Sequence, residues 1–241
     1  MVVIGDALTR KRRNDDLALG TDSRAGSYSY ETAITSAWKA GNLLRHYGVR
    51  TGATVAIDPG DGASPPPILA FLGAAMLGGV TDFAPDSGTA SDAKALLVPT
   101  ARVGEYDPGP GTQVLGYGAV PDQPGVAHFE REAWSENPVK PPDEVAAADP
   151  VLASTDGQIS HEAALTAAET VIEDADLTAS DTVGIRAPLS NPGTVVAGVV
   201  APLRAGATVL LDREQTGTVC VGIDGPESRA IDPDSVGADG F

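Results

Sequence analysis

The chain has 241 residues, of which 33 are acidic and 16 are basic, so its formal net charge is −17. A surface this negative repels phosphate groups, which excludes nucleic acid and anionic membranes as partners. The length allows one large domain or two small ones, each with a substantial core.

The composition also indicates the environment in which the protein works. Lysine is nearly absent, arginine supplies most of the cations, and small residues outnumber large apolar ones. Dense carboxylates with few lysines are typical of salt-adapted proteins of the haloarchaeal type. At molar salt the Debye length is about 3 Å, so neighbouring carboxylates no longer repel one another. An ordinary acidic protein is the alternative.

Cysteine usage and the apolar runs favour a soluble, cytoplasmic protein. The single cysteine, Cys220, excludes an intramolecular disulfide, and its apolar neighbours favour a buried, inert thiol. The N-terminus does not show the pattern of a secretory signal, since its apolar run is short and its charges follow that run. The longest uncharged apolar stretch, Ile68–Val80, is too short to span a bilayer.

The first predicted elements are a helix and a strand. Residues 1–27 are mostly polar, and their basic patch, Arg10–Arg13, is expected to be a solvated helix face, with an anion contact as the alternative. After Ser29, a capping residue, apolar side chains recur at helical spacing as far as Tyr47. A short strand is predicted next, at Thr54–Ile57.

Helices and strands continue to alternate in the middle of the chain. Proline in the first turn favours a buried helix at Pro65–Leu77. Strands are predicted at Val80–Ala84, Ala95–Val98 and Gln113–Tyr117. The segment 118–148 is rich in proline and acidic residues, which indicates a long connection over the surface.

The last third repeats the same alternation. Helices are predicted at His161–Asp174 and Gly193–Leu203. Strands are predicted at Thr182–Ala187, Ala207–Leu211 and Thr218–Ile223. Regular alternation of this kind predicts an α/β fold, in which parallel sheets are covered by helices on both faces.

Several stretches resemble one known family. The run YSYETAITSAWKAGNLLRHYGVRTGATVAI at 28–57 is similar to the opening unit of the adenylate-forming superfamily, which includes acyl-CoA synthetases, peptide-synthetase adenylation domains and luciferases. The helix and strand that lead to Pro85, and the run DTVGIRAPLSNPGTVVAGVVAPLRAGATVLL at 181–211, resemble later blocks of that family. Val151–Leu165 resembles its AMP-binding signature, a strand followed by a small-residue loop and a Ser-His helix start. The resemblance covers roughly residues 28–223 in the family's order.

The resemblance implies an architecture. It implies two interleaved, mostly parallel sheets flanked by helices, as in the N-terminal domain of acyl-CoA synthetases. We expect a first lobe at 1–144 and a second at 145–241, packed as one unit. Sheet edges and helix faces that the rest of the family's domain covers need cover here too. We therefore expect a homo-oligomer or a partner protein.

The signature loop departs from the family's pattern. Between the strand and the helix lie only residues 154–159, with one glycine, no lysine, and an acidic residue, Asp156, that repels phosphate. A phosphate cradle needs several small residues whose N–H groups converge, and usually a cation. The resemblance marks five candidate ligand-binding positions, which are Ser154, Thr155, Gly157, Ser160 and His161. The structural alternatives are a turn and helix cap for the serine and threonine, and a packing role for the histidine.

Other requirements of adenylation are missing from the sequence. The family's adenine-binding YG-x-T-E and ribose-binding TGD motifs do not occur, and no lysine lies at a matching motif position. The histidines, His46, His128 and His161, lie in separate predicted elements, which indicates no metal site. We therefore predict no catalytic residues, and no tight binding of ATP, AMP or CoA.

These observations favour a catalytically degenerate relative of the acyl-CoA synthetases. Its expected role is that of a non-catalytic partner or a small-ligand-binding module. The alternative is an ATP-dependent acid–CoA ligase, of the acetyl-CoA synthetase type, that acts in complex with a second chain. A stably folded relic without a molecular role is the third reading.

Overall fold

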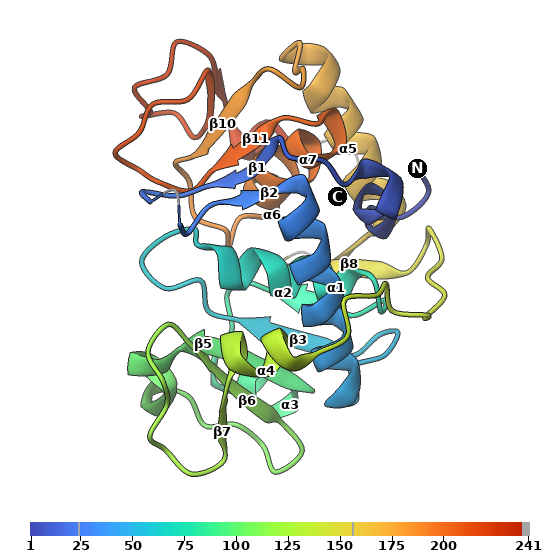
Figure 1. Ribbon diagram of the computed structural model, residues 1–241, viewed down its shortest axis with the longest axis vertical. Helices are drawn as coiled ribbons and strands as arrows, with labels where there is room; N and C mark the ends of the chain where they lie inside the picture. The colour runs from blue at the N-terminus through green and yellow to red at the C-terminus, as the bar shows by residue number, and fades with distance from the viewer. Residues whose placement is uncertain (24, 156, 238–241) are drawn as a thin grey trace.

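The computed structural model describes residues 1–23, 25–155 and 157–237. Figure 1 shows two β-sheets, one above the other, with helices between them. We name the upper one sheet A and the lower one sheet B. Sheet A contains, in spatial order, β13 (Ala230–Ile231), β12 (Val219–Val221), β10 (Thr182–Ile185), β11 (Thr208–Leu210), β1 (Leu17–Gly20) and β2 (Tyr28–Ser29).

Sheet B is longer. In spatial order it contains β7 (Val126–His128), β6 (Gln113–Tyr117), β5 (Ala95–Pro99), β3 (Thr54–Ile57), β4 (Val80–Asp82), β8 (Pro150–Ser154) and β9 (Gly157–Ser160). Neighbouring strands run parallel, except for the antiparallel pairs β1–β2 and β8–β9. The expected α/β fold with two mostly parallel sheets is therefore confirmed.

The helices fill the space between the sheets and cover the outer face of sheet B. The elements are α1 (Tyr30–His46), α2 (Pro65–Ala75), α3 (Ser87–Asp92), α4 (Phe129–Ser135), α5 (His161–Asp174), α6 (Pro192–Val195) and α7 (Ala201–Ala205), with short helices η1 (Ile4–Leu8), η2 (Arg10–Arg12), η3 (Thr100–Glu105) and η5 (Pro233–Ser235). Helix α2 packs against α1, and α5 packs against α7. Among the described residues, none of the helices is both long enough and apolar enough to cross a bilayer.

Local sequence explains how the main helices begin and bend. The Ser29 side chain accepts a hydrogen bond from the backbone N–H of Thr32 and so caps α1. Between α6 and α7 the helix continues through a π turn at Val196–Val200. Pro202 cannot donate a backbone hydrogen bond and its ring crowds the preceding turn, so the helix widens and Ala201 N–H bonds to Val196, five residues back.

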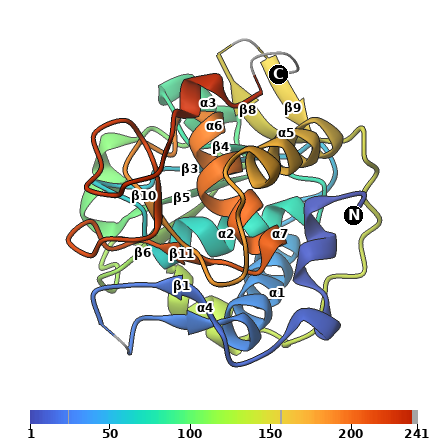
Figure 2. The same cartoon turned by 90° about the horizontal axis from the view of Figure 1, so that it is seen from above.

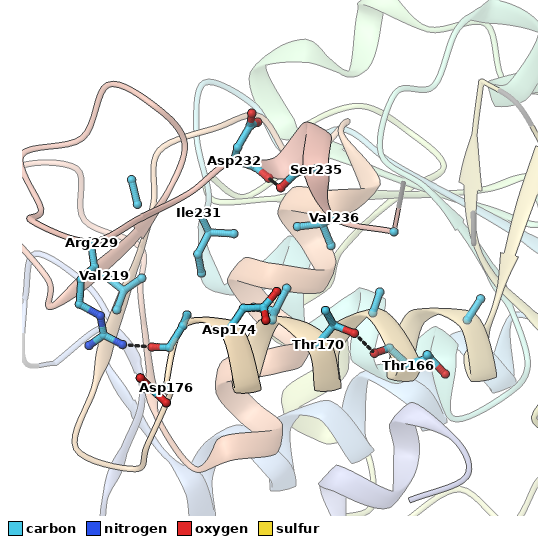
Figure 3. Close-up of a pocket in the computed structure, with 16 residues that line it drawn as sticks. Thr166, Thr170, Asp174, Asp176, Val219, Arg229, Ile231, Asp232, Ser235 and Val236 are labelled. Carbon is cyan, nitrogen blue, oxygen red and sulfur yellow. Dashed lines mark hydrogen bonds between the residues drawn. The ribbon is translucent and has the colours of Figure 1, made fainter. Parts of the chain in front are cut away.

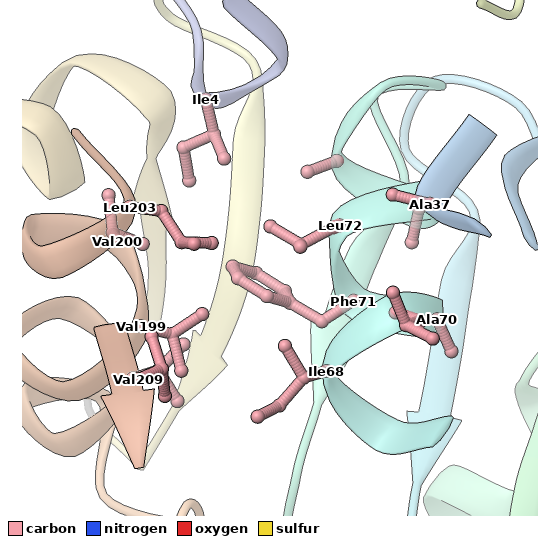
Figure 4. Close-up of a cluster of buried hydrophobic side chains, with 14 of the residues drawn as sticks. Ile4, Ala37, Ile68, Ala70, Phe71, Leu72, Val199, Val200, Leu203 and Val209 are labelled. Carbon is pink, nitrogen blue, oxygen red and sulfur yellow. The ribbon is translucent and has the colours of Figure 1, made fainter. Parts of the chain in front are cut away.

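The core lies where the central helices meet between the sheets. Figure 4 shows Phe71 and Ile68 of α2 facing Val199 and Leu203 of the α6–α7 helix, with Val209 of β11 beside them. All five side chains are buried. Burial of each such side chain stabilises the fold by about 1.5–3 kcal/mol, so this layer joins the two sheets into one hydrophobic core.

The expected boundary at residues 144 and 145 does not separate the two sheets. Strands β1 and β2 precede the boundary but pair within sheet A, whereas β8 and β9 follow it but pair within sheet B. The predicted surface connection at 118–148 was wrong in part, because it contains β7 and α4. Phe129, which is buried, anchors α4, and β7 is too short to show a periodic pattern.

The basic patch is a solvated helix face only in part, because Arg10 and Lys11 are exposed whereas Arg12 and Arg13 contact other parts of the chain. Arg12 donates hydrogen bonds to the carbonyl oxygens of Leu203, at 2.7 Å, and Arg204, at 2.9 Å, at the end of α7. The Arg13 guanidinium lies 5.7 Å from the centre of the Trp38 ring and pairs with Glu31. Carbonyl groups at a helix C-terminus attract cations, so this patch attaches the N-terminal segment to the core.

We predict that Gly73→Ala lowers the free energy of unfolding by about 1–3 kcal/mol, through overpacking. A Cβ atom on Gly73 of α2 would lie 2.6 Å from the Gly41 nitrogen of α1, so the helices would have to separate. Urea unfolding measures the change. Gly104→Ala is the control, because nothing lies within 4 Å of its Cβ position. Equal midpoints for the two variants would contradict close contact between α1 and α2.

Candidate functional site

The predicted phosphate loop is the tip of the β8–β9 hairpin. The hairpin pairs Leu152 with Ile159, Ala153 with Gln158, and Ser154 with Gly157. Only residues 155 and 156 remain between the last paired positions, which makes this a tight hairpin turn. Figure 2 shows β8 and β9 side by side at the edge of the molecule, next to α5.

The described residues of this turn are engaged locally or face solvent. Ser154 donates a hydrogen bond to the Gly157 carbonyl oxygen at 3.2 Å, and Thr155 and Gly157 are exposed. Asp156 lies outside the described residues. Paired strands direct their N–H groups across the ladder, so the amides of these strands do not converge on one point as in a phosphate cradle.

Ser160 begins helix α5. Its side chain accepts a hydrogen bond from Ala163 N–H at 3.1 Å, the geometry of an N-cap. The hydroxyl oxygen therefore stabilises the first turn of the helix. The Ser-His start of the family's signature is present here as a capped helix start.

His161 is buried against the N-terminal segment. Its Nδ1 atom accepts a hydrogen bond from Ile4 N–H at 3.2 Å, and its side chain is fully buried. Burial lowers the pKa of His161 to about 4, against a smaller opposing effect of Asp149 and Asp6. The ring is therefore neutral at pH 7, with its proton on Nε2, which finds no hydrogen-bond partner among the described residues.

The five candidate positions therefore lie close together in sequence but differ in accessibility. Ser154, Thr155 and Gly157 lie at the hairpin tip, whereas His161 points into the core. No group of three metal-binding side chains occurs in the part of the chain that the structure describes.

In sheet B, an ion pair occupies the point where the strand order reverses. The chain passes from β3 to β4 on one side and later to β5 on the other, and ligands in α/β folds bind at such points, beyond the carboxyl ends of the strands. Asp58 directly follows β3 and is buried. It accepts hydrogen bonds from Arg102, at 3.1 Å, and from Tyr106, at 2.9 Å. Burial, and then the Asp58 carboxylate, raise the pKa of Tyr106 to about 12.

Sheet A has an ion pair at the equivalent point. Strand β10 lies between β11 and β12, and Arg186 directly follows it. The Arg186 guanidinium bonds to the Glu227 carboxylate and to the carbonyl oxygens of Asp212 and Gln215. Burial alone raises the pKa of Glu227, but hydrogen bonds from Arg186 and from Gly217 N–H outweigh it and hold the pKa below its ordinary value.

These ion pairs were not predicted from the sequence. Arg186 lies within the run 181–211 quoted above, but neither it nor Asp58, Arg102 or Glu227 was marked as a candidate site residue. The available signal was a charged residue directly after an apolar strand, as in TVAID and TVGIR. The partners are 44 and 41 residues away, too far for a local pattern to reveal.

A cavity that none of these residues lines lies elsewhere, beside α5. It has a volume of about 810 Å³ and separates α5 from the C-terminal segment. Figure 3 shows α5 on one side, and Ile231, Asp232, Ser235 and Val236 on the other. We call it the α5 groove. A smaller cavity of about 400 Å³ lies beside α5, between the N-terminus and Arg204.

Solved structures share this fold over nearly the whole chain. The anthranilate CoA ligase AuaEII in complex with anthranoyl-AMP superposes with a TM-score of 0.76 at 19% identity, covering 91% of this chain and 49% of the ligase. For the benzoate CoA ligase from Burkholderia xenovorans the TM-score is 0.74, the identity 21%, and the coverage 91% and 50%. For the N-terminal domain of FACL13 from Mycobacterium tuberculosis the values are 0.73, 17%, 92% and 63%.

These similarities establish the fold. The chain has the fold of the N-terminal part of CoA ligases and spans about half the length of the first two. The expectation drawn from the sequence resemblance is confirmed at this level. No protein-family model matches the sequence, and no curated protein is found to be similar to it.

We predict that His161 makes stability depend on pH. The unfolded chain takes up a proton near the ordinary pKa of 6.5, whereas folded His161 resists protonation down to about 4. The unfolded state therefore binds more protons as the pH falls through this window. The free energy of unfolding is therefore unaffected by His161 above pH 6.5 and falls by up to about 3 kcal/mol as the pH drops towards 4.

Urea unfolding of the wild type and of His161→Asn, at neutral pH and at about pH 5, measures this effect. The variant keeps a hydrogen-bond acceptor but does not titrate, so its stability should change less between the two conditions. His46→Asn, at an exposed position, is the control and should retain the wild-type dependence. An unchanged pH dependence in His161→Asn would show that another group is responsible.

We predict that Glu227→Gln destabilises the protein by about 3 kcal/mol, because it leaves the Arg186 charge buried without its partner. The Glu227 side chain is fully buried, and that of Arg186 is 9% exposed. Glu132→Gln, which breaks a surface pair with Arg131, should cost less than about 1 kcal/mol. Similar losses in the two variants, measured by urea unfolding, would contradict the buried character of the Arg186–Glu227 pair.

Proposed function

We propose that this chain, which has the fold of the N-terminal part of CoA ligases, belongs to the adenylate-forming superfamily and is a non-catalytic member of it. Its proposed role is to bind a small ligand or a partner protein, including a second copy of itself. The observation that carries the proposal is the tight turn between Ser154 and Gly157 at the position of the family's phosphate loop.

A triphosphate at this turn would meet few favourable groups. Phosphate binding in proteins relies on convergent backbone N–H groups and on a nearby cation. The paired register leaves only residues 155 and 156 outside the ladder. The four lysines of the chain, Lys11, Lys39, Lys94 and Lys140, all lie outside the hairpin. Adenylation with ATP requires neutralisation of the negative charge on the phosphates, and these residues do not supply it.

The strand ends support the same proposal. The Asp58–Arg102 and Arg186–Glu227 pairs occupy the two points where α/β folds receive ligands. At the start of α6, Asn191 donates a hydrogen bond to the Asp234 carboxylate at 2.6 Å. A helix N-terminus attracts anions, and here the anion is the Asp234 carboxylate of the same chain.

The proposed environment is a salty cytoplasm. The net charge of −17, with sixteen basic residues against thirty-three acidic ones, supports salt adaptation, because screening removes the repulsion among carboxylates.

A second candidate function is a CoA ligase activity shared with another chain. The CoA ligases with this fold are about twice as long as the region that this chain matches. A separate polypeptide that supplies the absent motifs would then be required for ATP-dependent activation of an acid.

We predict that ATP, AMP and CoA leave the melting temperature unchanged in concentrated KCl, and that the chain catalyses no ATP–pyrophosphate exchange. A ligand at a hundred times its dissociation constant would add about 2.7 kcal/mol to the free energy of unfolding, which a thermal shift detects readily.

A nucleotide-dependent rise in melting temperature together with exchange activity would overturn the non-catalytic proposal. Exchange that appears only when a second chain is added would support the shared ligase instead. Silence toward each nucleotide, with a stoichiometric complex in a pull-down, would support the partner role.

A further inference from the structure

We propose that the α5 groove binds a small amphipathic cation, an apolar body that carries an ammonium or similar group. The inference gives a ligand class to the small-ligand role proposed above and rests on that role. It uses neither the β8–β9 turn nor the strand-end ion pairs.

The groove has the size and floor of a small-molecule site. Its volume of about 810 Å³ lies within the usual range of such sites, about 300–1,000 Å³. Side chains that are buried or partly buried form an apolar floor, from α5, β12, β13 and the C-terminal segment, namely Ala167, Val171, Val219, Ile231 and Val236. Small residues on both walls, such as Ala163 and Ala230, leave the space open.

The charged groups of the groove favour a cation. Carboxylates line it at Asp174, Asp176 and Asp232. Figure 3 shows Asp174 on the side of α5 that faces Ile231 and Val236. In the part of the chain that the structure describes, the Asp174 carboxylate has neither a hydrogen bond nor an ion pair, so it is available to a ligand.

The positive lining residue is already engaged. Arg229 donates to the Asp181 carboxylate at 2.9 Å and to the Ala175 carbonyl oxygen. Burial alone raises the pKa of Asp181, but its hydrogen bonds from Thr178 and Thr218, and then Arg229, hold the pKa below the ordinary value. The Asp181 carboxylate therefore neutralises Arg229, which weakens its attraction for an anion.

The helix itself adds to the negative potential. Asp174 is the last residue of the fourteen-residue helix α5, and Ala175 and Asp176 follow it along the groove. The carbonyl groups at a helix C-terminus carry a partial negative charge. The helix end and the carboxylates therefore act with the same sign, which disfavours carboxylates, phosphates and adenylates as occupants.

Three isosteric probes test the proposal, namely phenylpropylamine, phenylpropanol and phenylpropionate, which are cationic, neutral and anionic at neutral pH. Methyl NMR titration reports both affinity and location. The amine should perturb Val171, Val219, Ile231 and Val236. The amine should bind about tenfold tighter than phenylpropionate, because the exposed carboxylates of the groove attract the ammonium group and repel the carboxylate of the anionic probe.

Variants distinguish the effect of the groove's charge on amine binding from the effect of its open volume. Asp174→Asn should weaken amine binding about threefold, the effect of one solvent-exposed ion pair. Asp122→Asn makes the same change in net charge at an exposed site outside the groove, and should leave the affinity unchanged. Thr170→Phe, at an exposed position of α5 that lines the groove, should fill it and abolish binding of the amine. Circular dichroism confirms that each variant is folded.

Equal affinity for the three probes, or methyl shifts outside the groove, would overturn the inference. The inference would also be overturned if a second copy or a partner chain contacted the groove without the amine, which would broaden the NMR signals of the groove methyl groups. The ATP experiment does not depend on these outcomes, so failure here is distinguishable from failure of the non-catalytic proposal.

Discussion

The contact of α2 with the α6–α7 helix is the interaction on which both sheets depend. Each sheet is completed by strands from distant parts of the chain, since β1 pairs with β11 in sheet A and β8 pairs with β4 in sheet B. Neither sheet is therefore a continuous segment that can stand alone. Phe71 and Val199 belong to one core cluster that the two sheets share. Separation of the sheets would expose this core and leave each sheet with strands that the other half of the chain must hold in place.

The polar groups at the strand ends are used for the chain's own structure. Buried ion pairs add little net stability, because their desolvation offsets much of the attraction, but breaking one is costly. Arg186 and Glu227 therefore fix where the loops between β11 and β13 lie. A Cβ atom on Gly184 would lie 2.8 Å from the Arg186 guanidinium, so the guanidinium rests directly on the sheet. The absence of a side chain at Gly184 in β10 therefore leaves room for the Arg186 guanidinium against the sheet.

The sequence predicts the elements whose signals are local. The helices at α1 and α5 combine a serine cap with apolar residues at helical spacing, and the predicted bounds of α5 and of β6 agree with the structure. The short strands β1, β2 and β13 were not predicted, because they show no readable period and are determined by their pairing partners. For the candidate site, the helix start at Ser160 was readable. The packing role considered for His161 agrees with its burial, but its partner Ile4 was not readable, because it lies 157 residues away.

The distance along the chain between β1 and β11 also bears on how the protein is made. The Thr208 side chain bonds to the Leu17 carbonyl oxygen across 191 residues, and Arg12 reaches α7 over the same distance. During synthesis the first strand leaves the ribosome long before its partner exists. Contacts this far apart form slowly, and an unpaired apolar strand is open to wrong associations. The segment that carries β1 is therefore among the last to find its place.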